Sequence, residues 1–487
     1  MKSMPDLLLP AISLRSALLA QEFSAGDLLG AALAQIKRLN PALNAIVQMD
    51  EAAAWWAAAD SDRRIARGEA RPLEGLPVTI KDCFETTGLI TAVGAPSLRN
   101  YRPTEDARAV ARLRAGAILL GKSNVPMLTG DLETFNDVYG ITRNPWNLGY
   151  SPGGSSGGAA VAVATGMSAF ELGSDLAGSI RWPAQACGVF GLKTTWGLVW
   201  TFGHIPPLPD MRLERDPELL VVGPLARSAA DLAMALDVLA GPRDPTQPGP
   251  VPMPPRKVEP KGLRVAVWID EPLAVTDQTV VDAVQEAASR LEKAGAIVDP
   301  KARPEFSFAE AWEIAAVLIH ALIGAGLPEK IREKLADRSC DLVPGDLSHR
   351  TLQARGMRLQ QADLIDLEMR RKRLQSAWAR FFERIDVVLC PPAPVGAIRH
   401  DLTPNLHARG IEVNGQERPY YDLMFWACLA TGAGLPSVVA PVLVAPDGLP
   451  RGVQILAAAH EDRTAIACAA MLEGLGLGFK APPLANP

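Results

Sequence analysis

The spacing of hydrophobic and polar positions predicts helices at the start of the chain. Residues 12–39 carry apolar side chains three and four positions apart, with Ser24 and Asp27 as signals for a helix start. Asn40–Pro41 is expected to end this helix. The alanine-rich stretch Ala52–Arg67 predicts another helix. Residues 1–70 are therefore expected to be mainly helical.

Short apolar runs follow and predict buried strands. Gly75–Asp82 and Ala117–Lys122 have the length of strands and end in charged residues, while Ala107–Ala115 between them has helical spacing. Strands that alternate with helices in this way predict an α/β fold with helices on the faces of the sheet.

A proline-rich segment precedes a second series of elements. Eight prolines lie within residues 241–262, so this segment is expected to cross the surface in an extended form. No internal repeat is visible, and we expect a single domain over residues 1–487, with a core over 71–240 and the second half of the sheet over 263–487. Beyond the crossing the pattern predicts a strand, a helix, a strand, a helical insertion and a strand: Leu263–Ile269, Thr279–Ala294, Ala296–Val298, about 305–385, and Asp386–Leu389.

The composition excludes several classes of protein. A formal net charge of −5 disfavours a nucleic-acid-binding protein. The sequence contains no run of 18 apolar residues, so it predicts no membrane span, and the N-terminus lacks a signal-peptide core. The six cysteines and six histidines are scattered, without C-x-x-C or H-E-x-x-H. We therefore expect a cytoplasmic enzyme that needs no metal or organic cofactor and binds neither nucleic acid nor a membrane; a homodimer stays open.

The most unusual segment is a pair of serines between glycines. Ser155 and Ser156 lie within Ser151–Gly158, where glycines permit close backbone approach and uncommon dihedral angles. Three interpretations compete: an anion cradle at a helix N-terminus, a catalytic site that positions serine hydroxyls, and a flexible turn. The P-loop pattern G-x-x-x-x-G-K-[ST] is absent. This segment alone does not decide between the interpretations.

A second serine favours the catalytic interpretation. Ser179 lies within Gly173–Ala184, after small residues that expose consecutive backbone N–H groups. An oxyanion hole needs such donors in place before the negative charge of a tetrahedral intermediate develops.

These segments, in this order, resemble the amidase-signature hydrolases, and the resemblance covers most of the chain. It implies the amidase-signature fold, with a large, twisted, mixed central β-sheet covered by helices on both faces. The matching segments are Gly75–Asp82, Gly121–Pro126, Thr142–Asn147, Gly153–Gly158, Gly173–Pro183, Gly191–Lys193, Gly223–Arg227, Gly434–Pro436 and Leu449–Ile455.

The resemblance implies a role for each catalytic residue. Ser179 would attack the carbonyl carbon and form an acyl-enzyme. Ser155, preceded by a cis peptide bond in this family, would pass the proton of Ser179 to Lys81. Lys81 must be neutral for this role, and burial lowers the pKa of a lysine. The oxyanion hole would be formed by the backbone amides of Leu176, Ala177, Gly178 and Ser179.

Residues around the nucleophile are expected to support it. Asp175 and Arg181 predict a structural ion pair, and Ser156 a supporting hydrogen bond. The family usually has glycine at the position of Ala177. A positive φ there would make the alanine methyl group costly.

The expected substrate is a small amide or carbamate with an apolar or aromatic part. The resemblance indicates a pocket at Met127, Leu128 and Thr129. The aromatic residues in the loop beyond the signature, which include Trp200, predict an aromatic wall. Carbamates (a urethanase activity) and esters are expected as alternatives, because the motifs do not read the leaving group. Two other hypotheses stay open: the glutaminase subunit of a tRNA-dependent amidotransferase, and a catalytically silent scaffold of the same fold.

Overall fold

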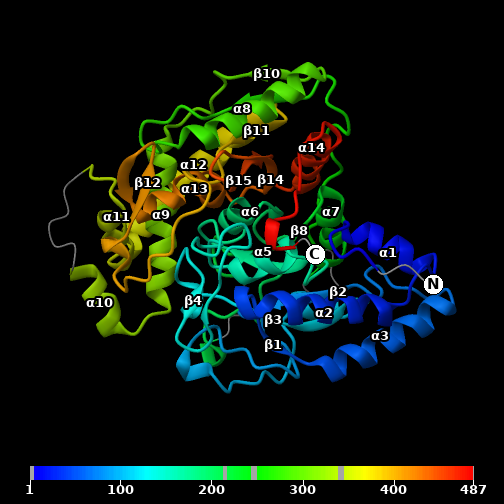
Figure 1. The fold of residues 1–487 in the computed structure, drawn as a ribbon. Coiled ribbons are helices and arrows are strands. Elements are labelled where there is room, and N and C mark those ends of the chain that lie inside the picture. Colours follow the sequence, from blue (N-terminus) through cyan, green and yellow to red (C-terminus); the bar gives the residue numbers. More distant parts are fainter. Residues whose placement is uncertain (1–4, 212–215, 243–248, 338–344, 486–487) are drawn as a thin grey trace.

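The centre of the molecule is a mixed β-sheet with helices on both faces (Figure 1). The structure, a computed structural model, describes residues 5–211, 216–242, 249–337 and 345–485. Within these ranges the sheet has 11 strands, which confirms the predicted α/β class. Across the sheet they are β1 (Ile46–Met49), β3 (Ile118–Ser123), β2 (Pro77–Lys81), β6 (Glu171–Asp175), β8 (Val221–Ala226), β7 (Phe190–Lys193), β14 (Ser437–Val444), β15 (Pro450–Leu456), β11 (Val387–Cys390), β9 (Arg264–Val267) and β10 (Ile297–Asp299).

The N-terminal region differs from the prediction of one helix over residues 12–39, which is wrong. Two helices are present, α1 (Ala11–Leu19) and α2 (Ala25–Leu43). Ser24 caps α2, since its hydroxyl accepts from the Asp27 N–H and the Asp27 carboxylate accepts from the Ser24 N–H, each at 2.9 Å. The capping box at Ser24 therefore starts a new helix, although the apolar spacing continues across it. Pro41 lies in the last turn of α2, where one missing N–H does not stop the helix.

The central strands bring their carboxyl ends to one edge of the sheet. β2 is parallel to both of its neighbours, β3 and β6. All five residues of β2 are buried, because strands flank it at both edges and helices such as α2 and α5 (Gly157–Ala164) cover the sheet. Ligands bind at the carboxyl ends of such strands, and Lys81 is the last residue of β2. The predicted neighbouring helices are α3 (Glu51–Ala66) and α4 (Arg108–Leu113).

The second half of the chain contains the predicted β-α-β unit. β9 and β10 are parallel and are joined by α8 (Gln278–Lys293). Residues 243–248 of the predicted crossing and residues 338–344 of the predicted insertion lie outside the described residues. The described part of the crossing, 249–262, lies against the start of α14 (Asp462–Gly474), where the Met253 N–H donates to the His460 carbonyl at 2.8 Å.

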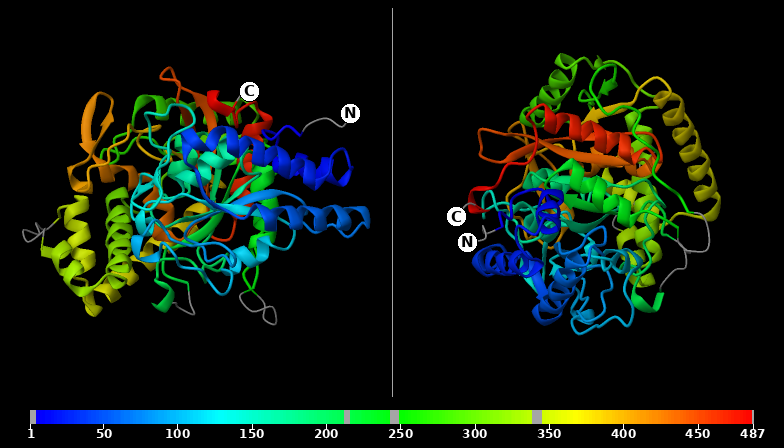
Figure 2. Two further views of the ribbon diagram at one scale, coloured as in Figure 1. Left: turned by 60° about the horizontal axis from the view of Figure 1, so that its bottom comes forward. Right: turned by 90° about the vertical axis from the view of Figure 1, so that its right-hand side faces the viewer.

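The predicted helical insertion builds a second hydrophobic core. Its helices lie at one side of the molecule, away from the N-terminal helices (Figure 2). Trp312 packs edge-on against Phe425 with ring centroids 4.6 Å apart. The helix of Trp312 is long and apolar enough to cross a membrane by composition, but 61% of it is buried inside the protein, as is typical of a core helix. The helices of the insertion are α9 (Phe308–Ala325), α10 (Glu329–Asp337), α11 (His349–Met357) and α12 (Gln361–Phe382). Helix α13 (Phe425–Ala433) follows the insertion in the sequence and belongs to the same core.

Candidate active site

A buried lysine contacts the first serine. The Lys81 Nζ lies 2.8 Å from the Ser155 Oγ and 3.0 Å from the Ser174 Oγ. Lys81 is fully buried, and burial lowers its pKa to about 8 because the ammonium form loses its hydration. A substantial fraction of Lys81 is therefore neutral near pH 8 and can accept a proton.

The serine–glycine segment is rigidly packed. Residues 151–158 are all buried, so the alternative of a flexible turn is wrong. The Gly154–Ser155 peptide bond is cis. A Cβ on Gly154 would lie 2.7 Å from the Leu132 carbonyl carbon, and one on Gly158 would lie 2.4 Å from the Asn124 nitrogen. These glycines are needed because neighbouring backbone comes too close for any side chain.

Ser179 lies on the turn between β6 and α6 (Arg181–Cys187) and is 8% exposed. Its carbonyl accepts a hydrogen bond from the Ser156 N–H at 3.2 Å, which joins the two serine-bearing segments. Within the described ranges, the Ser179 hydroxyl is not hydrogen-bonded to Ser155. Catalytic hydrogen bonds are often long in substrate-free enzymes and shorten when substrate binds.

The backbone N–H groups of the loop that ends at Ser179 differ in whether they already donate a hydrogen bond. The Gly178 N–H donates to the Asp175 Oδ1 at 2.8 Å and is therefore engaged. In the described part of the chain, the N–H groups of Leu176, Ala177 and Ser179 donate no hydrogen bond. The positive φ falls on Gly178 (108°), not on Ala177. The alanine at this position consequently costs no backbone strain.

Asp175 and Arg181 form a buried ion pair that fixes this loop. Their closest atoms are 2.8 Å apart, and neither side chain is exposed. Burial disfavours the charged carboxylate, but the Arg181 guanidinium overcomes this and holds the pKa of Asp175 well below its usual range. Arg181 also donates to the Ala427 carbonyl and, at 2.9 Å, to the Thr431 Oγ1 of α13. The pair thus connects the loop of Ser179 to the second core.

The predicted pocket residues lie on two segments of the chain, residues 127–129 and the loop that contains Trp200. Met127, Leu128 and Thr129 form a short 3-10 turn in which the Met127 side chain is 54% exposed. The Trp200 ring lies beneath the Arg108 guanidinium of α4, 5.3 Å from its centroid. The Trp200 ring also packs against Phe202, with ring centroids 5.3 Å apart. The contact of Trp200 and of the 127–129 turn with substrate stays a prediction.

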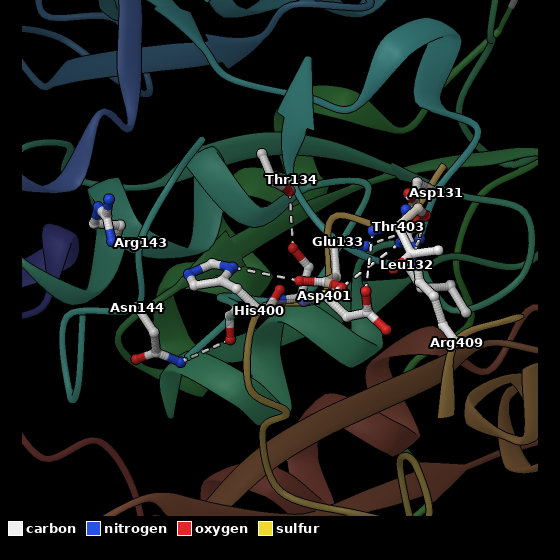
Figure 3. Close-up of polar contacts among 12 residues, drawn as sticks. Asp131, Leu132, Glu133, Thr134, Arg143, Asn144, His400, Asp401, Thr403 and Arg409 are labelled. Atoms are coloured by element: carbon white, nitrogen blue, oxygen red, sulfur yellow. Dashed lines mark hydrogen bonds and ion pairs between the residues drawn. The ribbon is translucent and has the colours of Figure 1, made fainter. Parts of the chain in front are cut away.

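A polar cluster between residues 131–134 and the segment 400–420 was not predicted, and Figure 3 shows part of it. Asp131 accepts from the Tyr420 hydroxyl at 2.7 Å and pairs with Arg409 at 2.9 Å. Glu133 contacts His400 at 3.3 Å. The cluster fixes residues 131–134 against the segment 400–420, which is distant in sequence. No local pattern indicates such contacts.

Two further residues beside Lys81 were also not predicted. Ser174 precedes Asp175 on β6, and His204 lies in the loop that follows Trp200. The His204 Nε2 is 2.9 Å from the Ser174 Oγ. An isolated histidine carries no pattern that indicates a catalytic neighbour, and only the fold brings His204 to Ser174.

Comparison with known proteins identifies relatives over the whole chain. The family described as Amidase matches residues 27–466. A glutamyl-tRNA(Gln) amidotransferase subunit of Roseiflexus castenholzii (strain DSM 13941 / HLO8) is 32% identical over 483 residues, covering 92% of both chains. The corresponding subunit of Desulforapulum autotrophicum (strain ATCC 43914 / DSM 3382 / VKM B-1955 / HRM2) is 42% identical over 235 residues, so that match spans only 46% of its length and 48% of this chain.

Solved structures agree with this result. A 6-aminohexanoate cyclic dimer hydrolase has a TM-score of 0.78 and 27% identity, covering 99% of this chain and 100% of its own. A bacterial aryl acylamidase of the amidase-signature enzymes has a TM-score of 0.79 at 24% identity, covering 99% of both chains, which supports the fold alone. Fold, ordered motifs and family match agree, and the chain therefore belongs to the amidase-signature family of hydrolases.

Proposed function

We propose that the protein hydrolyses a small carboxylic amide through an acyl-enzyme on Ser179. The observation that carries this proposal is the fully buried contact of 2.8 Å between the Lys81 Nζ and the Ser155 Oγ. A base and a relay hydroxyl are in contact there, on a segment that is hydrogen-bonded to the Ser179 carbonyl.

The chemistry follows from these positions. Neutral Lys81 takes the Ser155 proton while Ser155 takes the proton of Ser179, whose oxygen attacks the carbonyl carbon. The free N–H groups of Leu176, Ala177 and Ser179 then stabilise the oxyanion. Lys81 returns the proton through Ser155 to the leaving amine. Water attacks the acyl-enzyme by the same relay, releasing the acid and restoring Ser179.

The surroundings of the loop favour an apolar substrate. Leu176 and Ala177 pack against the second hydrophobic core, which contains Phe425 and Trp426. An acyl or amine group with an apolar or aromatic part is compatible with these neighbours. Carbamates and esters place the same carbonyl carbon before Ser179 and are proposed as side activities.

A second candidate is the glutaminase subunit of a tRNA-dependent amidotransferase. It is favoured by the relatives that carry an amidotransferase name, one of which is 32% identical over nearly the whole chain. A glutaminase subunit is expected to act on glutamine with its partner subunits, whereas an independent amidase acts alone.

The test uses matched p-nitroanilide, ester and carbamate substrates with benzyl-sized groups, and glutamine as a fourth substrate. Wild type, Ser179→Ala and a Cys468→Ala control are compared, since Cys468 is a buried thiol of α14 outside the site. Turnover lost only in Ser179→Ala supports the proposal. Activity on glutamine alone favours the amidotransferase interpretation. No turnover and no labelling of wild type by a serine-reactive phosphonate would identify a silent scaffold and overturn the proposal.

A further inference from the structure

Ser174 joins Lys81 to a buried histidine. Its Oγ lies 3.0 Å from the Lys81 Nζ and 2.9 Å from the His204 Nε2. The exposed fractions are 0% for Lys81, 2% for Ser174 and 5% for His204, so water does not substitute for any of these contacts. The Cys83 Sγ is a more distant neighbour of the same hydroxyl, at 3.7 Å.

The direction of each hydrogen bond follows from what each atom can donate. The His204 Nδ1 lies 3.0 Å from the Pro206 carbonyl oxygen, which can only accept, so Nδ1 carries the hydrogen. In a neutral imidazole Nε2 is then a bare acceptor. The Ser174 O–H must donate to it, and the Ser174 oxygen is left to accept an N–H of Lys81.

This polarity determines where the lone pair of Lys81 can point. A neutral amine has two N–H donors and one lone pair. Acceptors for the two donors are present on Ser174, the Oγ at 3.0 Å and the carbonyl at 3.4 Å. The remaining direction is that of the Ser155 Oγ, at 2.8 Å. We propose that His204 is a positioning residue, which acts through the Ser174 hydroxyl to aim the lone pair of Lys81 at Ser155. This inference rests on the proposed role of Lys81 as base.

His204 must be neutral for this role. Burial lowers its pKa to about 3, and the charge of protonated Lys81 acts in the same direction. Lys81 and Cys83 are the titratable groups facing it from the β2 side, and the edge of the Phe84 ring covers it at 5.2 Å. An imidazolium would donate to Ser174 and reverse the chain of hydrogen bonds.

Carboxylates on β6 influence the protonation of Lys81, which is the other end of the hydrogen-bond chain from His204. Glu171 and Asp175 of β6, together with Cys83, favour the charged form of Lys81 but do not offset its burial. These groups stay in place when His204 is replaced. A change in the titration of Lys81 in such a variant therefore reports on the hydrogen bonds rather than on a lost charge.

The backbone around His204 holds the ring in place independently of Ser174. The His204 N–H donates to the Thr201 carbonyl at 3.0 Å, and the Ile205 N–H donates to the Cys83 carbonyl at 2.8 Å. His204 also forms a β-bridge with Phe84. The loop is thus attached to the segment that follows β2, and a side-chain substitution at 204 leaves these bonds available.

The test measures kcat and kcat/KM against pH for wild type, His204→Leu, Ser174→Ala and the double variant, with thermal unfolding as a check on folding. In His204→Leu we expect kcat to fall about ten- to a hundredfold. The freed Ser174 O–H can donate to the lone pair of Lys81, which stabilises the neutral amine. The acidic limb, along which kcat/KM rises as Lys81 loses its proton, should therefore move to lower pH while the plateau falls.

Three outcomes would overturn the proposal. A limb that moves to higher pH indicates that water has entered and that His204 acts only by packing. Unchanged kcat and limb in His204→Leu show that the contact has no function. If the fold losses of kcat in His204→Leu and Ser174→Ala multiply in the double variant, the two residues act independently. His204 then does not act through Ser174. His460→Asn, an exposed histidine whose φ of 65° suits asparagine, is the matched control.

If Lys81→Ala keeps the wild-type rate, the proposed function itself fails. If Lys81→Ala is inactive and His204→Leu behaves like wild type, only the positioning role fails. Labelling by a serine-reactive phosphonate separates the cases further, because it should be slower in His204→Leu while its final extent stays the same.

Discussion

The edge of the sheet near Lys81 and the helical insertion are filled by different kinds of buried side chain. At the sheet edge, Ser174 and Arg181 each make several hydrogen bonds. In the insertion, His320 and His349 contact each other at 2.8 Å, while both Nδ1 atoms lack a partner among the described residues. Aromatic packing dominates there instead. The sheet edge also leaves the buried Asp82 Oδ1 without a hydrogen bond to any described residue, and the insertion contains the well-bonded Arg371. The two regions therefore differ in the side chains that fill them, which are polar groups around Lys81 and mainly aromatic rings in the insertion.

The largest expected effect lies at the sheet edge. Ser179→Ala should lower kcat/KM by about 10⁴-fold or more, because the acyl-enzyme can no longer form. Thermal unfolding should change little, since the hydroxyl is not hydrogen-bonded to Ser155. The measurement is kcat/KM on the best substrate of the panel. Retained turnover would show that another residue is the nucleophile and that the sheet edge near Ser179 is not the reactive region.

Arg181 links the two regions, so its replacement measures how much the buried ion pair contributes to stability. Arg181→Ala leaves the buried Asp175 carboxylate without its ion-pair partner, and should cost about 3–5 kcal/mol of unfolding free energy. Urea unfolding measures it. Arg63→Ala is the control, because that arginine pairs with Asp60 on the surface of α3 and its loss should matter little. Equal effects in both variants would contradict the structural role of the pair.

Trp312→Leu probes the insertion alone. Trp312 is 1% exposed and packs on Phe425, so the smaller side chain should cost about 2–4 kcal/mol. We expect KM to rise while the pH dependence keeps its position. Trp56→Leu, at a position 70% exposed, serves as the control. A shifted pH limb in Trp312→Leu would mean that the insertion also adjusts Lys81.

The pH dependence of kcat/KM tests the sheet edge through the titration of Lys81. Lys81 must be unprotonated to accept a proton, and burial lowers its pKa to about 8. The value of kcat/KM should therefore rise about tenfold per pH unit below about pH 8 and level off above it. Activity that is constant from pH 6 to 9, with Lys81 still essential, would contradict a titrating lysine.

The smallest effect is expected at Ala177. Because the positive φ lies at Gly178, Ala177→Gly relieves no strain and should lower the unfolding free energy by about 1 kcal/mol or less. The value of kcat/KM should stay within about twofold. A large gain in rate would show that the methyl group obstructs the oxyanion loop.

The sequence predicted those features whose signal is local. The apolar run ending at Lys81 predicted β2, and the glycines around Ser155 and Ser179 predicted the two tight segments. The same local reasoning merged α1 and α2, because their apolar spacing continues across the break before Ser24. The contact of Ser174 with Lys81 has no local signal, since the two residues meet only when β2 and β6 pair.

Contacts between distant segments were not predictable from one sequence. His204 lies 30 residues beyond Ser174, and the isolated histidine carries no pattern that indicates its partner. Asp131 and Arg409 are 278 residues apart and meet through the fold. The engagement of the Gly178 N–H by Asp175 likewise depends on how the loop turns, which composition does not specify.

The bond from Arg181 to Ala427 has an evolutionary consequence. Its acceptor is a main-chain carbonyl, which any residue at position 427 supplies if the helix is kept and the side chain fits against Gly178. Mutations along α13 that keep the helix can then accumulate without breaking this bond to the Ser179 loop. A lineage with this arrangement can vary the residue at 427 while the loop keeps its position.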